Sequence, residues 1–181
     1  MSLVEKKYGN TSINRIADYQ KNIEVFQAFS KDVQLSKVNL YLNQLLPQYD
    51  NIIQKQEDYW ATPKEFLSQG YGDCEDYVII KYFTLLALGF DEKNLFITVV
   101  HERFRGGTHM VLSYFQTQDT TPLVLDNLSF RILPLEQRED LIADIFINSG
   151  GVYKYQNKKL VKAASKHTKY QELLTKIKKG L

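Results

Sequence analysis

Apolar side chains recur at helical spacing in the first quarter of the chain. Between residues 12 and 29 they fall three or four positions apart, and the same spacing returns from Val38 until the pattern stops near Pro47. Side chains at these intervals lie on one face of an α-helix. Both segments are therefore predicted to be helices that pack against a core and carry no chemistry of their own.

Two further helices are predicted before residue 90. Thr62 followed by Pro63 and then by Glu65 is typical of a capped helix start, so we expect a short helix over residues 63–68 that ends at Gly70. The next helix is predicted to begin near Cys74. Its residues 78–86 are apolar on almost every side, which indicates a central and buried helix.

The second half of the chain changes to alternating and β-branched segments bounded by turn residues. Strands are predicted at residues 95–101, 108–115, 121–126, 130–133, 142–148 and 152–155. Helices followed by an antiparallel sheet give an α+β fold. A chain of 181 residues suits one core, so we predict one domain over residues 1–181, with residues 1–10 disordered or artificial and a basic helix over residues 156–181.

Composition narrows the possible classes of function. The single cysteine excludes an intramolecular disulfide and a multi-cysteine zinc site, and no apolar run approaches the length of a membrane span. From Lys154 onward nine lysines face one glutamate. Such a tail can contact nucleic acid, an acidic partner or an anionic membrane, but a solvated helix face explains it better because it contains no arginine.

Cys74 is a candidate nucleophile because it stands at a predicted helix start. The free N–H groups and the positive dipole end there favour the thiolate, the form that attacks carbonyl carbon. The alternative is a buried cysteine that only fills the core.

His109 and Asp126 are candidates for the other two members of a catalytic triad. If the two strands pair around the turn at residues 116–119, His109 lies opposite Asp126, with Cβ atoms about 4.5–5.5 Å apart. A cysteine protease needs such a histidine to move the thiol proton and a carboxylate to orient its ring. The alternatives are a structural strand histidine and a turn aspartate.

Several motifs together resemble one family. They are Trp60-Ala61-Thr62-Pro63 with Glu65-Phe66-Leu67, Gly72-Asp73-Cys74-Glu75-Asp76-Tyr77 with Lys81-Tyr82, His109-Met110-Val111-Leu112, and Leu123-Val124-Leu125-Asp126-Asn127. These segments resemble the bacterial transglutaminase-like cysteine proteinases, and within them the LapG-type periplasmic proteases. The resemblance covers about residues 58–155. The lysine-rich end has no counterpart in the family pattern.

The resemblance implies a papain-like fold variant with Cys74 as nucleophile, His109 as base and Asp126 as orienting residue. LapG-type enzymes cleave a large surface adhesin near its N-terminus, at a site with two alanines, and so release cells from biofilm. They are inhibited by the periplasmic domain of an inner-membrane receptor that senses cyclic di-GMP. A periplasmic location is therefore expected, with the export signal missing from this chain. Trp60 is open to two interpretations, an aromatic of the core or its rim and a wall of the cleft that Cys74 faces. The expected oxyanion donors are the Cys74 amide and a side chain from the loop that contains Trp60.

The family also uses calcium, which the resemblance assigns to Asp73, Glu75 and Asp76. Carboxylates this close to a thiol raise its pKa, and a bound divalent cation reverses that local field. The alternative is ordinary capping of the helix start by Asp73 and Asp76. Two other functions stay open at this point: transfer of the acyl group to an amine, and a calcium-dependent binding module without catalysis.

Overall fold

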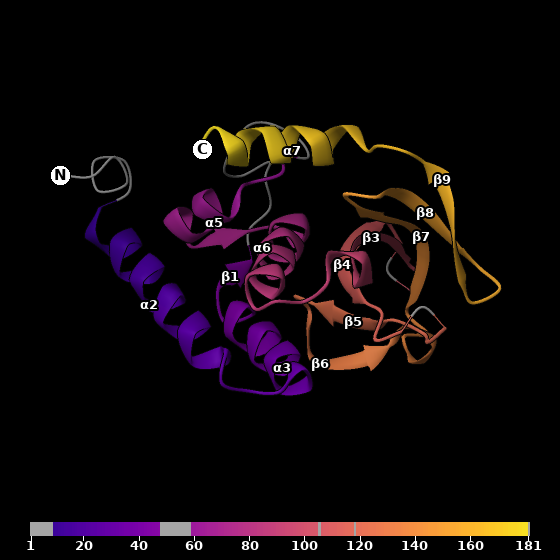
Figure 1. Cartoon of the computed structure of the whole chain (residues 1–181), viewed down its shortest axis with the longest axis horizontal. Coiled ribbons are helices and arrows are strands. Elements are labelled where there is room, and N and C mark those ends of the chain that lie inside the picture. The colour runs from indigo at the N-terminus through magenta and orange to yellow at the C-terminus, as the bar shows by residue number, and fades with distance from the viewer. Residues whose placement is uncertain (1–8, 48–58, 105, 118, 181) are drawn as a thin grey trace.

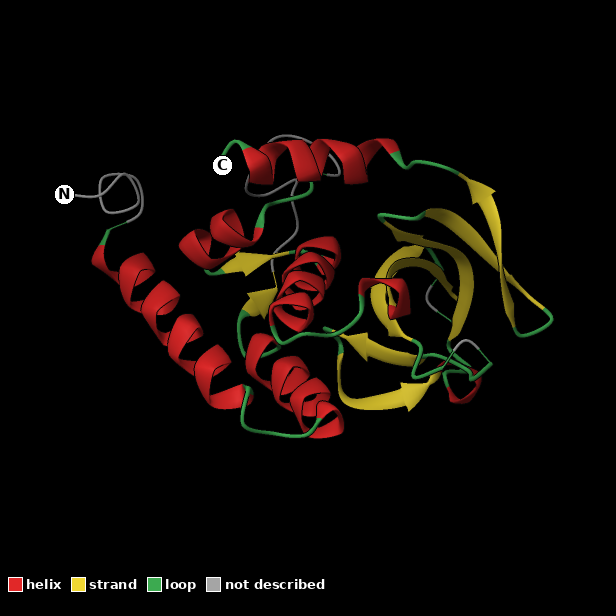
Figure 2. Ribbon diagram, viewed as in Figure 1, coloured by secondary structure: helices red, strands yellow, loops and turns green. Residues whose placement is uncertain are grey.

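The helices gather on one side of the molecule and the strands on the other, with one helix between them (Figures 1 and 2). A computed structural model describes residues 9–47, 59–104, 106–117 and 119–180. The helices that precede the sheet are α2 (Asn10–Phe26), α3 (Lys31–Leu42), α5 (Pro63–Gln69) and α6 (Cys74–Ala87). The two predicted packing helices are confirmed, and Asn10, expected in a disordered segment, already belongs to α2.

The second predicted packing helix ends earlier than the apolar pattern does. Helix α3 stops at Leu42, and the chain then forms the short strand β1 (Leu46–Pro47), which pairs in parallel with β2 (Tyr71–Gly72). The predicted pattern stops near Pro47, and residues 48–58 lie outside the described residues. The strand pair joins the end of α3 to the loop that precedes Cys74.

The predicted caps of α5 are confirmed atom by atom. The Thr62 hydroxyl accepts a hydrogen bond from the Glu65 amide, and the Glu65 carboxylate accepts one from the Thr62 amide. Gly70 ends the helix in the left-handed conformation, with φ of 82°, which a residue without Cβ adopts at little cost. This sharp stop directs the chain into β2 and then into α6.

Helix α6 is the central helix of the fold. It packs on β4 (Thr108–Tyr114) and β3 (Leu95–Glu102) on one side and on α3 and α5 on the other. Its apolar residues are almost completely buried, as in Val78, Ile79 and Leu85. The prediction of a central and buried helix that begins near Cys74 is confirmed, because α6 packs between the sheet and two other helices.

One antiparallel sheet of seven strands carries the second half of the chain. Its order is β6-β5-β4-β3-β7-β8-β9. The strands not yet introduced are β5 (Leu123–Asp126), β6 (Ser129–Pro134), β7 (Leu141–Asn148), β8 (Gly151–Gln156) and β9 (Lys159–Ala164). The α+β prediction and the six predicted strands are confirmed. Among the described residues, no helix has the length and apolar composition that crossing a membrane requires.

The predicted basic helix over residues 156–181 is wrong in its first half. Asn157 and Lys158 adopt positive φ angles of 50° and 62°, which make the tight turn of a hairpin. Strand β9 therefore returns along β8, and backbone pairing overrides the helical preference of its alanines. The helix begins only at Thr168, as α7 (Thr168–Lys178).

The pairing of β4 with β5 also differs from the prediction. Leu112 lies opposite Leu125 and Ser113 opposite Val124, which is two residues away from the predicted register. The expected turn of four residues is replaced by a longer connection, because β4 ends at Tyr114 and β5 begins only at Leu123. A shift of two residues keeps every side chain on its predicted face.

Candidate active site

Cys74 is the first residue of α6, and its thiol is half-buried. The thiol donates a hydrogen bond to the Glu75 carboxylate, with 3.2 Å between Sγ and Oε2. Burial is the largest cause that raises the pKa of the Cys74 thiol. The negative charges of Glu75 and Asp73 and the hydrogen bond to Glu75 raise it further, and a hydrogen bond from the Met110 backbone lowers it. The thiol is therefore protonated at rest.

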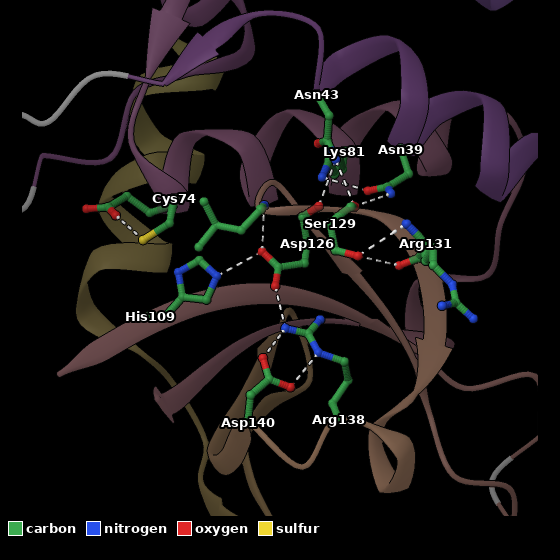
Figure 3. Close-up of polar contacts among 12 residues, drawn as sticks. Asn39, Asn43, Cys74, Lys81, His109, Asp126, Ser129, Arg131, Arg138 and Asp140 are labelled. Atoms are coloured by element: carbon green, nitrogen blue, oxygen red, sulfur yellow. Dashed lines mark hydrogen bonds and ion pairs between the residues drawn. The ribbon is translucent and has the colours of Figure 1, made fainter. Parts of the chain in front are cut away.

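His109 lies on β4 directly before Met110. The Met110 amide hydrogen-bonds the sulfur of Cys74, and this contact brings the neighbouring His109 close to the thiol. His109 Nε2 and Asp126 Oδ1 are 2.9 Å apart. Figure 3 shows the imidazole ring between Cys74 and Asp126, with its other nitrogen on the side of the sulfur. The predicted contact between histidine and aspartate is confirmed, although as a diagonal pair instead of a directly opposite one. The structure brings all three candidate residues together.

Asp126 is completely buried and has three hydrogen-bond donors on its carboxylate. Besides His109, the Leu128 amide donates to Oδ1 at 3.0 Å and Arg138 Nη2 donates to Oδ2 at 2.8 Å. Burial alone would raise the pKa of Asp126. The hydrogen bond and charge of His109, with those from Leu128 and Arg138, outweigh burial and hold the pKa below its ordinary value. Asp126 therefore stays ionised and can fix the orientation of the ring.

Sequence reasoning missed the residues that hold Asp126. Arg138 also contacts both oxygens of Asp140, at 2.8 Å from Nε and 2.7 Å from Nη2, so its guanidinium bridges two carboxylates. Neither residue belongs to a periodic pattern or a motif, and no sequence signal marks them. Lys81 was quoted only as part of a family motif, although it had a signal of its own: it is the only charged residue among residues 77–87 of α6.

Trp60 is buried beneath α7. Its ring stacks on His167, with 5.6 Å between the ring centroids, and its carbonyl accepts a hydrogen bond from Lys176. The next residue, Ala61, donates its amide to Asp76 Oδ1 at 2.8 Å. The segment that contains Trp60 is thus fixed both to α7 and to the first turn of α6.

The three acidic residues assigned to calcium do not point toward one common position. The Glu75 carboxylate accepts the Cys74 thiol, and Asp76 accepts the Ala61 amide. Asp73 occupies the N-cap position of α6 without a side-chain capping bond. Within the described parts of the chain, no three His, Cys, Asp or Glu side chains form a group that could hold a metal ion. The donors have calcium chemistry, but their present arrangement is not a formed site.

Residues 10–140 match the model of a protein family described as bacterial transglutaminase-like cysteine proteinase BTLCP. The chain belongs to this family. It is therefore a cysteine proteinase of transglutaminase-like fold, and the resemblance inferred from its motifs is confirmed. No curated protein sequence matches the chain.

Solved structures of Legionella pneumophila LapG are similar to this proteinase over nearly its full length. The calcium-bound LapG structure has 33% sequence identity and a TM-score of 0.85, and the match covers 96% of this chain and 95% of LapG. EGTA-treated LapG also has 33% identity and a TM-score of 0.85, with 97% and 94% covered. The proteinase is thus of the LapG type, and the match extends past the family region to include the C-terminal part.

Proposed function

We propose that this proteinase cleaves peptide bonds with Cys74 as nucleophile, His109 as general base and acid, and Asp126 as the residue that orients the imidazole. The single observation that carries the proposal is the buried 2.9 Å contact between His109 Nε2 and Asp126 Oδ1. It leaves Nδ1 as the ring nitrogen available to the thiol. Two side chains that were only strand and turn residues would need no such ionised, three-donor arrangement.

The proposed reaction passes two protons through His109 in turn, the first from the thiol to the amine and the second from water to the sulfur. Nδ1 takes the thiol proton as the Cys74 sulfur attacks the carbonyl carbon, and the imidazolium gives that proton to the amine nitrogen as the C–N bond breaks. Water then attacks the thioester and loses a proton to the imidazole. The sulfur leaves as the acid product forms, and the thiol regains the proton.

The proposed oxyanion donors come from the two elements that flank the thiol. The Cys74 amide belongs to the first turn of α6, where the helix leaves backbone N–H groups unused. The Trp60 indole N–H is buried and has no hydrogen-bond partner among the described residues. A buried donor without an acceptor favours a role for Trp60 when charge develops on a substrate oxygen.

Calcium binding near Asp73, Glu75 and Asp76 is a separate proposal. It rests on three hard oxygen donors close together in the sequence and on the calcium-bound state of a LapG structure at 33% identity. Because Glu75 and Asp76 have other partners here, binding would require at least one of them to turn. A rise in melting temperature with calcium but not with magnesium, absent in Asp73→Ala, would support it. Equal curves with both ions would contradict it.

The proposed substrate is the N-terminal region of a large surface adhesin, cleaved to control biofilm attachment. The proposed regulator is the periplasmic domain of a receptor for cyclic di-GMP, which places this enzyme in the periplasm. The support is the LapG-type identity of the chain, with matching length as well as matching site segments.

The test is incubation of the purified chain with adhesin N-terminal fragments, in calcium and in EGTA. We expect one cleavage at a small-residue site, no cleavage by Cys74→Ala or His109→Ala, and full activity in His101→Ala, whose imidazole is exposed. Cleavage that survives Cys74→Ala would overturn the mechanism. Products joined to an added amine would instead indicate acyl transfer.

A further inference from the structure

Lys81 is the feature that the proposed reaction does not use. It lies on α6, seven residues and about two helical turns after Cys74, and its side chain is 0% exposed. A fully buried lysine is rare and costly unless an acid neutralises it. Lys81 forms no ion pair with any described residue. Its Nζ donates instead to Asn39 Oδ1, at 2.8 Å.

The amide groups of α3 connect Lys81 to the backbone around Asp126. Asn39 Nδ2 donates to the Ser129 carbonyl at 2.9 Å. Asn43 Nδ2 donates to the carbonyls of Asp126 and Ser129, at 2.8 and 3.0 Å. Asp126 and Ser129 are the paired ends of the turn between β5 and β6. Figure 3 shows this cluster on the side of Asp126 away from Arg138.

Charge links Lys81 to the same turn. Burial lowers the pKa of Lys81 to about 7, and the negative charge of Asp126 opposes that shift. The charges of Lys81 and Asp126 therefore attract each other through the protein interior, where charges interact more strongly than in water. The position of the Asp126 carboxylate is thus coupled to the helix that bears Cys74.

We propose that Lys81 is a positioning residue for the Asp126 side chain. Through Asn39 it holds the turn at residues 126–129 in a fixed place relative to α6, so the nucleophile and the residue that orients His109 keep one geometry. Lys81 touches no reacting atom. This inference rests on the proposed function, because it assigns a role within the same triad.

The test compares Lys81→Met with Thr84→Val in the fragment-cleavage assay. Thr84 lies about one turn further along α6, is also buried, and hydrogen-bonds Tyr19 of α2 instead of Asn39. We expect Lys81→Met to lower kcat by about 10- to 100-fold, as small misplacements of catalytic groups do, with KM maintained and a melting temperature no lower than that of the wild type. Thr84→Val is expected to lower the melting temperature and leave kcat unchanged.

A second variant keeps the inference testable if Lys81→Met folds poorly. Asn39→Asp retains an acceptor for Lys81 but loses the donor to Ser129, so it should reproduce the loss of kcat. Unchanged kcat in a folded variant of either kind would overturn the inference while leaving the proposed function intact. So would a loss of kcat in Thr84→Val as large as the loss in Lys81→Met, because the effect would then not be specific to Lys81. A wild-type chain without any cleavage would overturn both.

Discussion

Replacing Lys81 by methionine should change the pH dependence of stability in a defined direction. In the folded chain, burial lowers the pKa of this lysine from its ordinary value of 10.5 to about 7. In the unfolded chain the ordinary value applies. Between these two pH values the unfolded state binds one more proton than the folded state, so wild-type stability rises with pH across this window.

The magnitude follows from the width of that window. Each pH unit is worth about 1.4 kcal/mol, so titration from 10.5 down to about 7 corresponds to about 5 kcal/mol. Methionine removes this cost but leaves Asn39 Oδ1 without its donor, which costs about 1–3 kcal/mol. Lys81→Met should therefore be about 2–4 kcal/mol more stable than wild type at pH 6, and slightly less stable near pH 10.

The assay is urea unfolding of both proteins at intervals between pH 6 and 10, with the difference in unfolding free energy plotted against pH. Groups that titrate equally in both proteins contribute equally to the two unfolding free energies, so their contributions cancel in the difference. Thr84→Val serves as the control, because it changes a buried hydrogen bond of α6 without changing charge. A Lys81→Met difference that is flat across this range would refute the reasoning, since Lys81 would then titrate alike in both states.

Three further changes test the contacts around the site. Asp126→Asn should lower kcat by at least about 100-fold. Because the pKa of Asp126 lies below its ordinary value, the wild type should also lose more stability than the variant as pH falls below about 4, which urea unfolding at pH 5 and pH 3 will show. Arg138→Lys replaces a planar fork by one ammonium and should cost about 1–2 kcal/mol in urea unfolding; equal stability would contradict the bridging role. Lys176→Met removes the bond to the Trp60 carbonyl and should speed amide hydrogen exchange in α7, so unchanged exchange would argue against that contact.

Local patterns of apolar residues predicted the helices and strands, because buried side chains recur at a regular interval along each element. The same patterns could not predict the register of β4 against β5, because residues 115–122 connect the two strands and periodicity does not fix the length of that connection. Strand β9 was missed for a related reason: its alanines and lysines suit a helix, and only the left-handed pair Asn157 and Lys158 turns them into a strand.

The predicted contact between His109 and Asp126 forms although the β4–β5 register differs from the prediction, because the difference is an even number of residues. Side chains alternate between faces, so a shift of two residues left His109 and Asp126 on the same face and within diagonal reach. The contacts of Arg138 and Asn39 could not be predicted from the sequence. Arg138 contacts the Asp126 carboxylate and Asn39 contacts the Ser129 carbonyl, and the fold brings both pairs together without any regular spacing along the chain.

The Asp126–His109 pair and the Cys74 thiol differ in how close their resting states are to those that the proposed reaction requires. Asp126 is ionised, buried and bonded to His109 and Arg138, so the orienting half needs no rearrangement before reaction. The thiol of Cys74, in contrast, is protonated and bonded to Glu75. The histidine can take the thiol proton only after that bond opens. In the proposed mechanism, Asp126 fixes the orientation of the imidazole, and the hydrogen bond from the Cys74 thiol to Glu75 opens before the thiol proton moves.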